Sequence, residues 1–115
     1  MALPKQRRLK ESKIISQVFS KARPTQEFGI SVRAMDSRQQ LSRFVVVVPM
    51  KSAPLAVHRN AIRRRVAETL QRIVTAGGIA PRKNVVVTVR SLLPNATTLE
   101  KSLVLLLRKS GILQQ

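Results

Sequence analysis

Arginine side chains are concentrated in one short stretch of the sequence, VHRNAIRRRVAETL at residues 57–70. Seven consecutive positions hold four arginines, next to a histidine and an asparagine: Arg59, Arg63, Arg64, Arg65, His58 and Asn60. A guanidinium grips two phosphate oxygens at once, and an asparagine amide can bond a base or a ribose hydroxyl. The stretch therefore predicts contacts to a phosphate-bearing partner, the alternative being a basic helix face that only meets water.

Acid–base or metal chemistry has no comparable support in the sequence. The five acidic residues are scattered singly, without the spacing of a catalytic acid pair or a cation cage: Glu11, Glu27, Asp36, Glu68 and Glu100. His58 is the one histidine, and there is no cysteine to join it in a metal site. Gly77-Gly78 ends a helical pattern instead of opening one, so no glycine-rich phosphate loop is indicated. We expect no catalytic residue and no metal ligand in this chain.

The overall charge points to a polyanionic partner. Lys and Arg total 22 against five acids, a net charge of +17 over 115 residues. Solubility alone requires a net charge of only about 2–8 in a small domain. Nucleic acid is the leading candidate and an anionic membrane surface the second. Without cysteines, a signal sequence or an apolar run of membrane-spanning length, we expect a cytoplasmic protein of one domain, residues 1–115.

Periodicity predicts an α+β domain of three helices and about four strands. Apolar spacing favours helices over residues 12–21 and 59–74, and a closing helix that begins with Thr97 as N-cap. Strands are expected over residues 28–35, 43–48 and 84–90, with a further short strand near Thr25. The connector 50–58 contains Pro54 and is expected to be non-helical, at least at its start. Residues 1–10 are basic and are expected to be flexible.

The helix over residues 59–74 places the arginines. Its apolar residues, Ile62, Val66, Leu70 and Ile73, form one stripe, so we expect the helix to pack on another element. It connects two valine-rich strands, which form a βαβ unit if they are parallel neighbours. A start near Arg59 would set the free N–H groups of the first turn among the arginines. Both features favour an anion there.

These residues resemble the protein subunit of bacterial ribonuclease P. The resemblance is carried by Lys51 in the connector, Ala56-Val57, Arg59-Asn60, Arg63-Arg64 and Glu68. It extends to RLKESKIISQVF, SRFVVVVPMK, NVVVTVR and LEKSLVLLLRKSGIL, in the same order as in the family. Two alanines, Ala61 and Ala67, stand where the family pattern has arginine.

The resemblance implies both a fold and an activity. The fold is a twisted sheet with packed helices, like the second domain of ribosomal small-subunit protein five, with a left-handed βαβ crossover. The activity is removal of the 5′ leader from precursor tRNA by a ribonucleoprotein whose RNA subunit is the catalyst and holds magnesium. The protein is expected to bind no cofactor itself. Its partners would be the catalytic RNA and the precursor tRNA, with no membrane.

The resemblance also assigns the candidate site residues to two groups. The first is expected to contact the catalytic RNA: Lys51, His58, Arg59, Asn60, Arg63, Arg64 and Arg65. The second is expected to line a cleft for the leader between the opening helix and the sheet: Ile15, Phe19 and Phe44. For Phe19 core packing is an equal alternative, and for Phe44 it is the stronger one.

Two other functional classes stay open on sequence alone. A ribosomal or nucleoid-type protein would hold RNA or DNA with no role in cleavage. A self-sufficient nuclease would cut RNA without an RNA subunit, although no residue set for it is visible.

Overall fold

A four-stranded mixed sheet forms the centre of the computed structural model, which describes residues 3–90 and 96–114. Its strands are β1 (Thr25–Glu27), β2 (Ile30–Asp36), β3 (Arg43–Val47) and β4 (Lys83–Val89). They lie in the order β1-β2-β4-β3. β1 with β2 and β2 with β4 are antiparallel, and β3 with β4 is parallel. The short strand expected near Thr25 is therefore present, as an edge strand.

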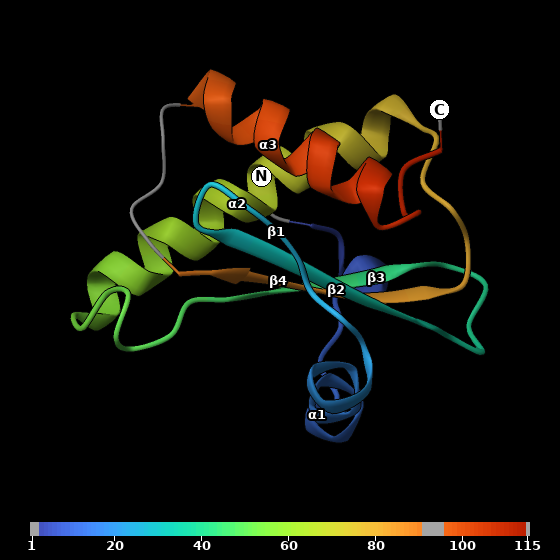
Figure 1. Cartoon of the computed structure of the whole chain (residues 1–115), viewed down its shortest axis with the longest axis horizontal. Helices are drawn as coiled ribbons and strands as arrows, with labels where there is room; N and C mark the ends of the chain where they lie inside the picture. Colours follow the sequence, from blue (N-terminus) through green and yellow to red (C-terminus); the bar gives the residue numbers. More distant parts are fainter. Residues whose placement is uncertain (1–2, 91–95, 115) are drawn as a thin grey trace.

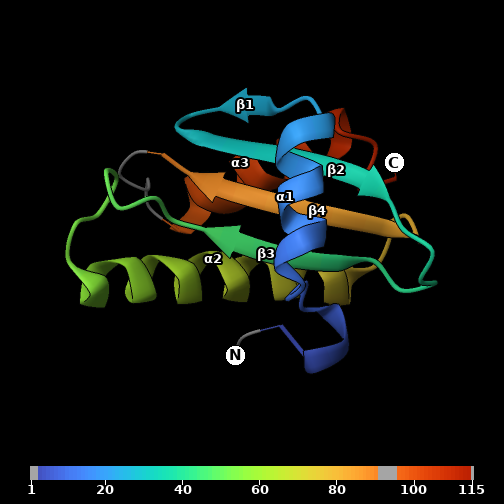
Figure 2. The same ribbon diagram turned by 90° about the horizontal axis from the view of Figure 1, so that it is seen from below.

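Helices cover the two faces of this sheet unequally. Figure 1 shows α2 (Ala56–Ala76) and α3 (Ala96–Lys109) above the sheet and α1 (Ser12–Lys21) alone below it. In Figure 2, seen from the α1 side, α1 lies across the strands of the sheet. In that view β3 and β4 point the same way, β4 lies above β3, and α2 passes behind them. This crossover is left-handed, so the predicted α+β fold with its exceptional connection is confirmed.

The larger core lies between the sheet and the helices α2 and α3. This core contains three valines of β4: Val85, Val87 and Val89. Leucines of α3 such as Leu103 and Leu107 are fully buried in the same core. The smaller core lies under α1, where Val18 packs with Val86 and Leu9. β4 is buried on both faces, because it lies between β2 and β3 and has helices on either side. The unalternated valine run of residues 43–48 predicts burial on both faces, or nearly so, but the valines of β3 are only half-buried because β3 is an edge strand.

The boundaries of three elements differ from the sequence prediction. Phe28 and Gly29 form the turn between β1 and β2 with φ of 49° and 77°, so β2 begins at Ile30. Helix α2 begins at Ala56, one turn before the predicted start, because Pro54 precedes the N-cap Leu55 and blocks no helical hydrogen bond. Helix α3 begins at Ala96, so Thr97 lies inside it and is not its N-cap.

The prediction of a flexible N-terminal segment is wrong for residues 3–10. Leu3 and Leu9 are 4% and 2% exposed, and residues Lys5–Arg7 form a 3-10 turn between them. The Leu9 N–H donates to the Phe44 carbonyl at 2.9 Å, and Arg8 Nε donates to the Leu3 carbonyl at 2.8 Å. Two buried leucines and these hydrogen bonds hold the basic segment against the open edge of β3.

Candidate nucleic-acid interface

The early start of α2 changes what its arginines can do. Arg63 is the eighth residue of the helix, about 10 Å from its first residue. The helix dipole acts mainly within the first turn, so it favours an anion near His58 and Arg59 but hardly at Arg63 or Arg64. The prediction that the free N–H groups of the helix lie among all the arginines is therefore wrong. Binding at Arg63 and Arg64 depends on their own charge.

Arg59 has a structural role that its sequence position did not reveal. Its Nη1 donates to the carbonyls of Ala53 and Pro54, at 3.0 and 2.8 Å. The side chain ties the connector to the first turn of α2. Lys51 in the connector and His58 on the helix are both exposed. Arg59 thus fixes the position of the exposed groups around it.

Asn60, Arg63 and Arg64 form a hydrogen-bonded group on one side of α2. Arg63 Nη2 donates to Asn60 Oδ1, and Arg64 Nε approaches the Asn60 carbonyl at 3.5 Å. At 100° per residue, Arg65 falls on the opposite flank of the helix. The arginines therefore lie on both flanks of the helix, as the helical spacing of the sequence predicts. The group built from Asn60, Arg63 and Arg64 faces the N-terminal segment.

The N-terminal segment adds cations that the sequence did not place on this side. Arg8 and Lys10 line one groove together with Arg63 and Arg64. We call these four side chains and Asn60 the α2 surface. Among the residues that the structure describes, no acidic side chain lines the groove. The proximity of Arg8 and Lys10 could not be read from the sequence, because it depends on Leu3 and Leu9 being buried.

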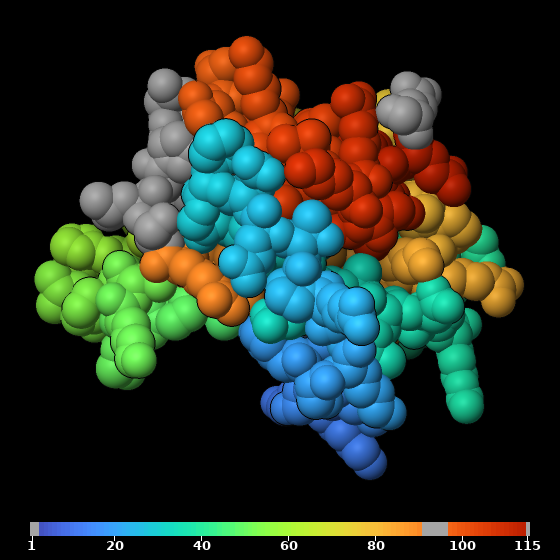
Figure 3. All heavy atoms as spheres, in the orientation of Figure 1, coloured from blue at the N-terminus to red at the C-terminus, as the bar shows by residue number. Residues whose placement is uncertain are grey.

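A second candidate surface lies on the α1 side of the sheet, beside Phe19. The Phe19 ring is 37% exposed, and the guanidinium carbon of Arg33 lies 5.0 Å from its centre. Ile15 is half-buried against the small core under α1. In Figure 3 the blue atoms of α1 project from the lower side of the molecule. The Phe19 ring is thus accessible to solvent and is also held next to a cation. A residue buried in the core would not be accessible, and a free side chain would not be held.

Polar groups without partners lie in the sheet next to Arg33. Ser31 and Thr88 are paired in register on β2 and β4, 1% and 4% exposed, and neither side-chain hydroxyl has a hydrogen-bond partner within the described residues. Burying an unpaired hydroxyl costs about 1–3 kcal/mol. Both hydroxyls face the α1 side, because they alternate with core residues such as Val32 and Val87. We call Ile15, Phe19, Ser31, Arg33 and Thr88 the Phe19 surface.

Phe44 does not belong to the Phe19 surface. Its ring is 1% exposed and packs in the large core with α2 and α3, on the opposite face of the sheet from α1. The prediction that Phe44 lines a cleft beside α1 is therefore wrong, and the alternative of core packing is correct. The alternation of side chains along β3 explains the difference, since its neighbours Val45 and Val47 face α1.

An ion pair anchors the helix that carries Phe19. Arg43 of β3 donates from Nη1 to both carboxylate oxygens of Glu11, at 2.9 and 3.1 Å. Glu11 is the N-cap residue of α1, so this contact fixes the start of the helix on the sheet. The hydrogen bond from Arg43 lowers the pKa of the Glu11 carboxyl, with smaller contributions from backbone N–H groups. Lys83 lowers the pKa of Asp36 in the same way.

The acidic side chains do not assemble a cation site in the described residues. Four of them are engaged in ion pairs: Glu11 with Arg43, Asp36 with Lys83, Glu27 with Lys109 and Glu100 with Arg72. No group of three or more His, Cys, Asp or Glu occurs within residues 3–90 and 96–114. Across that same part of the chain, no helix is both long enough and apolar enough to cross a membrane.

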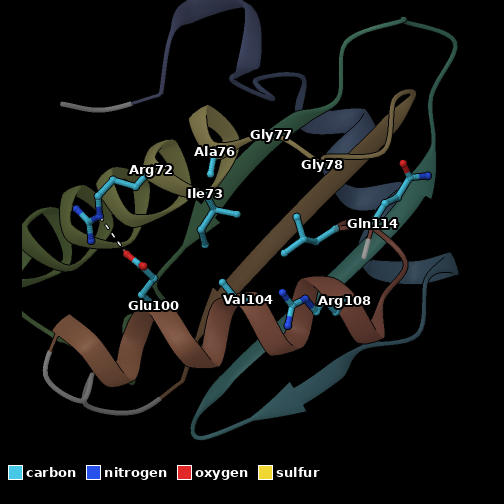
Figure 4. A pocket seen from close by; sticks show the side chains of 10 residues that line it. Arg72, Ile73, Ala76, Gly77, Gly78, Glu100, Val104, Arg108 and Gln114 are labelled. Carbon is cyan, nitrogen blue, oxygen red and sulfur yellow. Dashed lines mark hydrogen bonds and ion pairs between the residues drawn. The ribbon is translucent and has the colours of Figure 1, made fainter.

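A pocket between α2 and α3 is a less suitable anion site. It has a volume of about 370 Å³, and Figure 4 shows Arg72 pointing across it to Glu100, with Arg108 further along α3. Arg72 Nε donates to Glu100 Oε1 at 3.1 Å. The carboxylate already compensates one of the two arginines there. The α2 surface and the Phe19 surface are therefore the better candidates.

Comparisons with known proteins point to one family. The family model described as Ribonuclease P matches residues 3–111. The Staphylococcus aureus RNase P protein structure has a TM-score of 0.79 at 20% identity, covering 94% of this chain and 98% of that one. The Thermotoga maritima RNase P protein has a TM-score of 0.76 at 25% identity, covering 89% and 96%. A search of curated proteins finds no match.

Proposed function

The chain belongs to the ribonuclease P protein family, and from that premise we propose that it binds the catalytic RNA on one side and the precursor-tRNA leader on the other. The observation that carries this proposal is the separation of two unlike surfaces. The α2 surface is rich in arginine and lysine, and the Phe19 surface combines an exposed ring with buried hydroxyls. They lie on different sides of one rigid sheet, so each can hold a different RNA.

The α2 surface is suited to a folded RNA. The helix and the buried N-terminal leucines fix the backbone that carries its four cations, so little backbone entropy is lost on binding. Contacts to phosphates position an RNA without reading its sequence. Lys51, His58 and Arg59 extend the proposed contact along α2 and the connector, and Arg65 adds a contact for RNA that reaches around to the opposite flank of α2. Asn60 adds a group able to bond a base or a ribose hydroxyl.

The Phe19 surface is suited to a single strand. An exposed ring offers a stacking platform to any base, and Arg33 beside it supplies positive charge. The hydroxyls of Ser31 and Thr88 are covered in this structure, so a nucleotide reaches them only when α1 shifts on the sheet, and they can then donate to it or accept from it. Leader nucleotides are unpaired and can present their faces, whereas a paired duplex cannot. We therefore assign the leader to this side.

The proposed division of labour leaves catalysis to the RNA subunit. The carboxylates described above are held by cations of the chain itself, so the residues present do not fit a magnesium site. The protein contributes positive charge, orientation and substrate affinity. By neutralising phosphates, it takes over part of the work that free cations would otherwise do.

Cleavage of a precursor tRNA at low magnesium tests the proposal. The catalytic RNA from the same genome is incubated with and without the protein, and the product ends are mapped. Stimulated cleavage at the mature 5′ end is expected. RNA binding without stimulation would instead identify an architectural RNA-binding protein. Cleavage by the protein alone would show that it carries catalytic residues.

A further inference from the structure

An apolar groove lies inside the α2 surface, between the edge of β3, the N-terminal segment and α2. Its volume is about 290 Å³. Its floor is formed by aliphatic side chains: Leu3, Leu9, Val45, Val46 and Ala67. Its rim carries the four cations of the α2 surface. The groove thus combines an apolar interior with a ring of positive charge.

The open edge of β3 borders this groove. Within the described residues, only Phe44 of β3 is bridged to the N-terminal segment, through the hydrogen bond from Leu9 to its carbonyl. Backbone groups alternate along a strand, so Val46 presents its N–H and C=O to the same outer edge. After Lys10 the chain turns away to Glu11, which is held by Arg43 under the sheet. The described part of the chain therefore leaves the edge uncovered where the groove begins.

The size and charge of the groove restrict what can occupy it. About 290 Å³ is at the lower end of ligand sites, which span roughly 300–1,000 Å³, so it accepts one small group and not a helix. The interior favours an apolar group. The rim favours an anion, because arginine and lysine side chains surround the groove and none of its described lining residues is acidic. A nucleotide has these two parts joined, a flat base and a phosphate on each side.

We propose that this groove takes one unpaired nucleotide of the catalytic RNA, with its base on the aliphatic floor and its flanking phosphates on Arg8, Lys10, Arg63 and Arg64. The inference rests on the proposed function, which places that RNA on α2. The backbone of Val46 lies where it can hydrogen-bond the edge of the base. A paired base has its edge occupied and cannot enter, so the nucleotide comes from a loop, a bulge or a junction.

Filling the groove without changing its charge tests this inference. Ala67→Leu adds bulk to the floor, and leucine is compatible with the helix. We expect the affinity for the catalytic RNA to fall about 10-fold, since burying roughly 60 Å² of apolar surface is worth about 1.5 kcal/mol, with an unchanged salt dependence. The matched control is Ala76→Leu. Ala76 is also on α2 and is exposed, and it lies nine residues beyond Ala67, about 14 Å away. The affinity of this variant should equal that of the wild type.

RNA variants make the test independent of how well Ala67→Leu folds. Unpaired nucleotides of the catalytic RNA are replaced one at a time by abasic sugars, which keep the phosphates. One position should weaken binding of the wild-type protein by the same factor as Ala67→Leu, and the two changes together should weaken it no further. If wild-type protein binds and stimulates cleavage but no abasic position has this effect, the inference is wrong while the proposed function stands. Unchanged RNA affinity of the Ala67→Leu variant would also overturn the inference. The open edge of β3 would then be available to another occupant, such as an extended peptide. Failure of the wild-type protein to bind the catalytic RNA would overturn both.

Discussion

The guanidinium of Arg33 lies over the ring of Phe19, with its central carbon 5.0 Å from the ring centre. This interaction joins α1 to β2 at the surface that we assign to the leader. It keeps an accessible ring in one orientation, so that a base can stack on it without first ordering the side chain.

Removing the Phe19 ring should weaken leader binding selectively. Phe19→Ala deletes the stacking platform, and one base–aromatic stack is worth about 1–3 kcal/mol. We expect the protein–RNA complex to bind precursor tRNA about 5- to 100-fold more weakly, the range that this energy corresponds to, and to bind mature tRNA as before. Leu105→Ala, at a comparably exposed side chain on α3, is the control. Equal losses for both tRNAs would argue against a leader contact.

Replacing Thr88 should weaken leader binding without lowering the stability of the protein. Thr88→Val replaces it with a methyl group, and because the hydroxyl has no partner among the described residues we expect the free energy of unfolding to stay the same or rise. Leader affinity should fall about 2- to 10-fold, the value of one hydrogen bond. Ser102→Ala removes another buried, unpartnered hydroxyl on α3 and should leave leader affinity unchanged. A loss of stability in Thr88→Val, measured by urea unfolding, would show that the hydroxyl is paired within the protein.

Arg63 and Arg64 should account for part of the salt dependence of RNA binding. Removing one phosphate-binding side chain should reduce the slope of log affinity against log salt by about 0.7–0.9. We expect this reduction for Arg63→Ala and for Arg64→Ala with the catalytic RNA. Arg108→Ala removes the same charge from α3, on the pocket shown in Figure 4, and should leave the slope close to that of the wild type. Equal slopes for all three variants would contradict phosphate binding on α2.

The Glu11–Arg43 pair should make stability depend on pH in the acid range. Arg43 lowers the pKa of Glu11 below its ordinary value of 4.5, so the folded state favours the ionised carboxylate. This contribution is present above about pH 4.5 and is lost as the pH falls through the lowered pKa. Unfolding measured from pH 7 to pH 2 should show a shallower decline for Glu11→Gln. Parallel curves for wild type and variant would mean that the pair does not contribute.

Phe44 should be a stability residue and not a binding residue. Phe44→Ala leaves a cavity in the large core, where the ring is 1% exposed, and should cost about 3–5 kcal/mol. Phe44→Leu retains most of the volume and should restore most of the stability. At a temperature where both variants are folded, their leader affinity should match the wild type. A leader defect in a stable Phe44→Leu protein would return Phe44 to the binding surface.

The sequence was sufficient for the arrangement of the main elements. The valine-rich stretches predicted the strands β3 and β4, and the Ile62–Ile73 stripe predicted a helix with one buried face. Both patterns are local: the valine runs favour strands by composition, and the stripe has the period of a helix. The start of α2 was misjudged because Pro54 was treated as a barrier, although a proline just before the N-cap is compatible with a helix.

The two surfaces were less predictable because they depend on contacts between distant residues. Nothing local in the first ten residues shows that Leu3 enters the core formed by α2, α3 and the sheet, which is what sets Arg8 beside Arg63. The face on which Phe44 lies follows from the register of β3, which the unalternated run of valines leaves undetermined. Ser31 and Thr88 could be paired only once β2 and β4 were known to be neighbours.

The assignment of two RNAs to two sides of the sheet is tested most directly by tethered cleavage. The sequence contains no cysteine, so Ser16→Cys on α1 and Ala61→Cys on α2 each provide a single attachment point for an iron chelate that cuts nearby RNA. Each labelled protein is assembled with the catalytic RNA and a precursor tRNA, and the cuts are mapped. We predict cuts in the leader from Ser16→Cys and in the catalytic RNA from Ala61→Cys. Leader cuts from Ala61→Cys, with cuts only in the catalytic RNA from Ser16→Cys, would contradict the account.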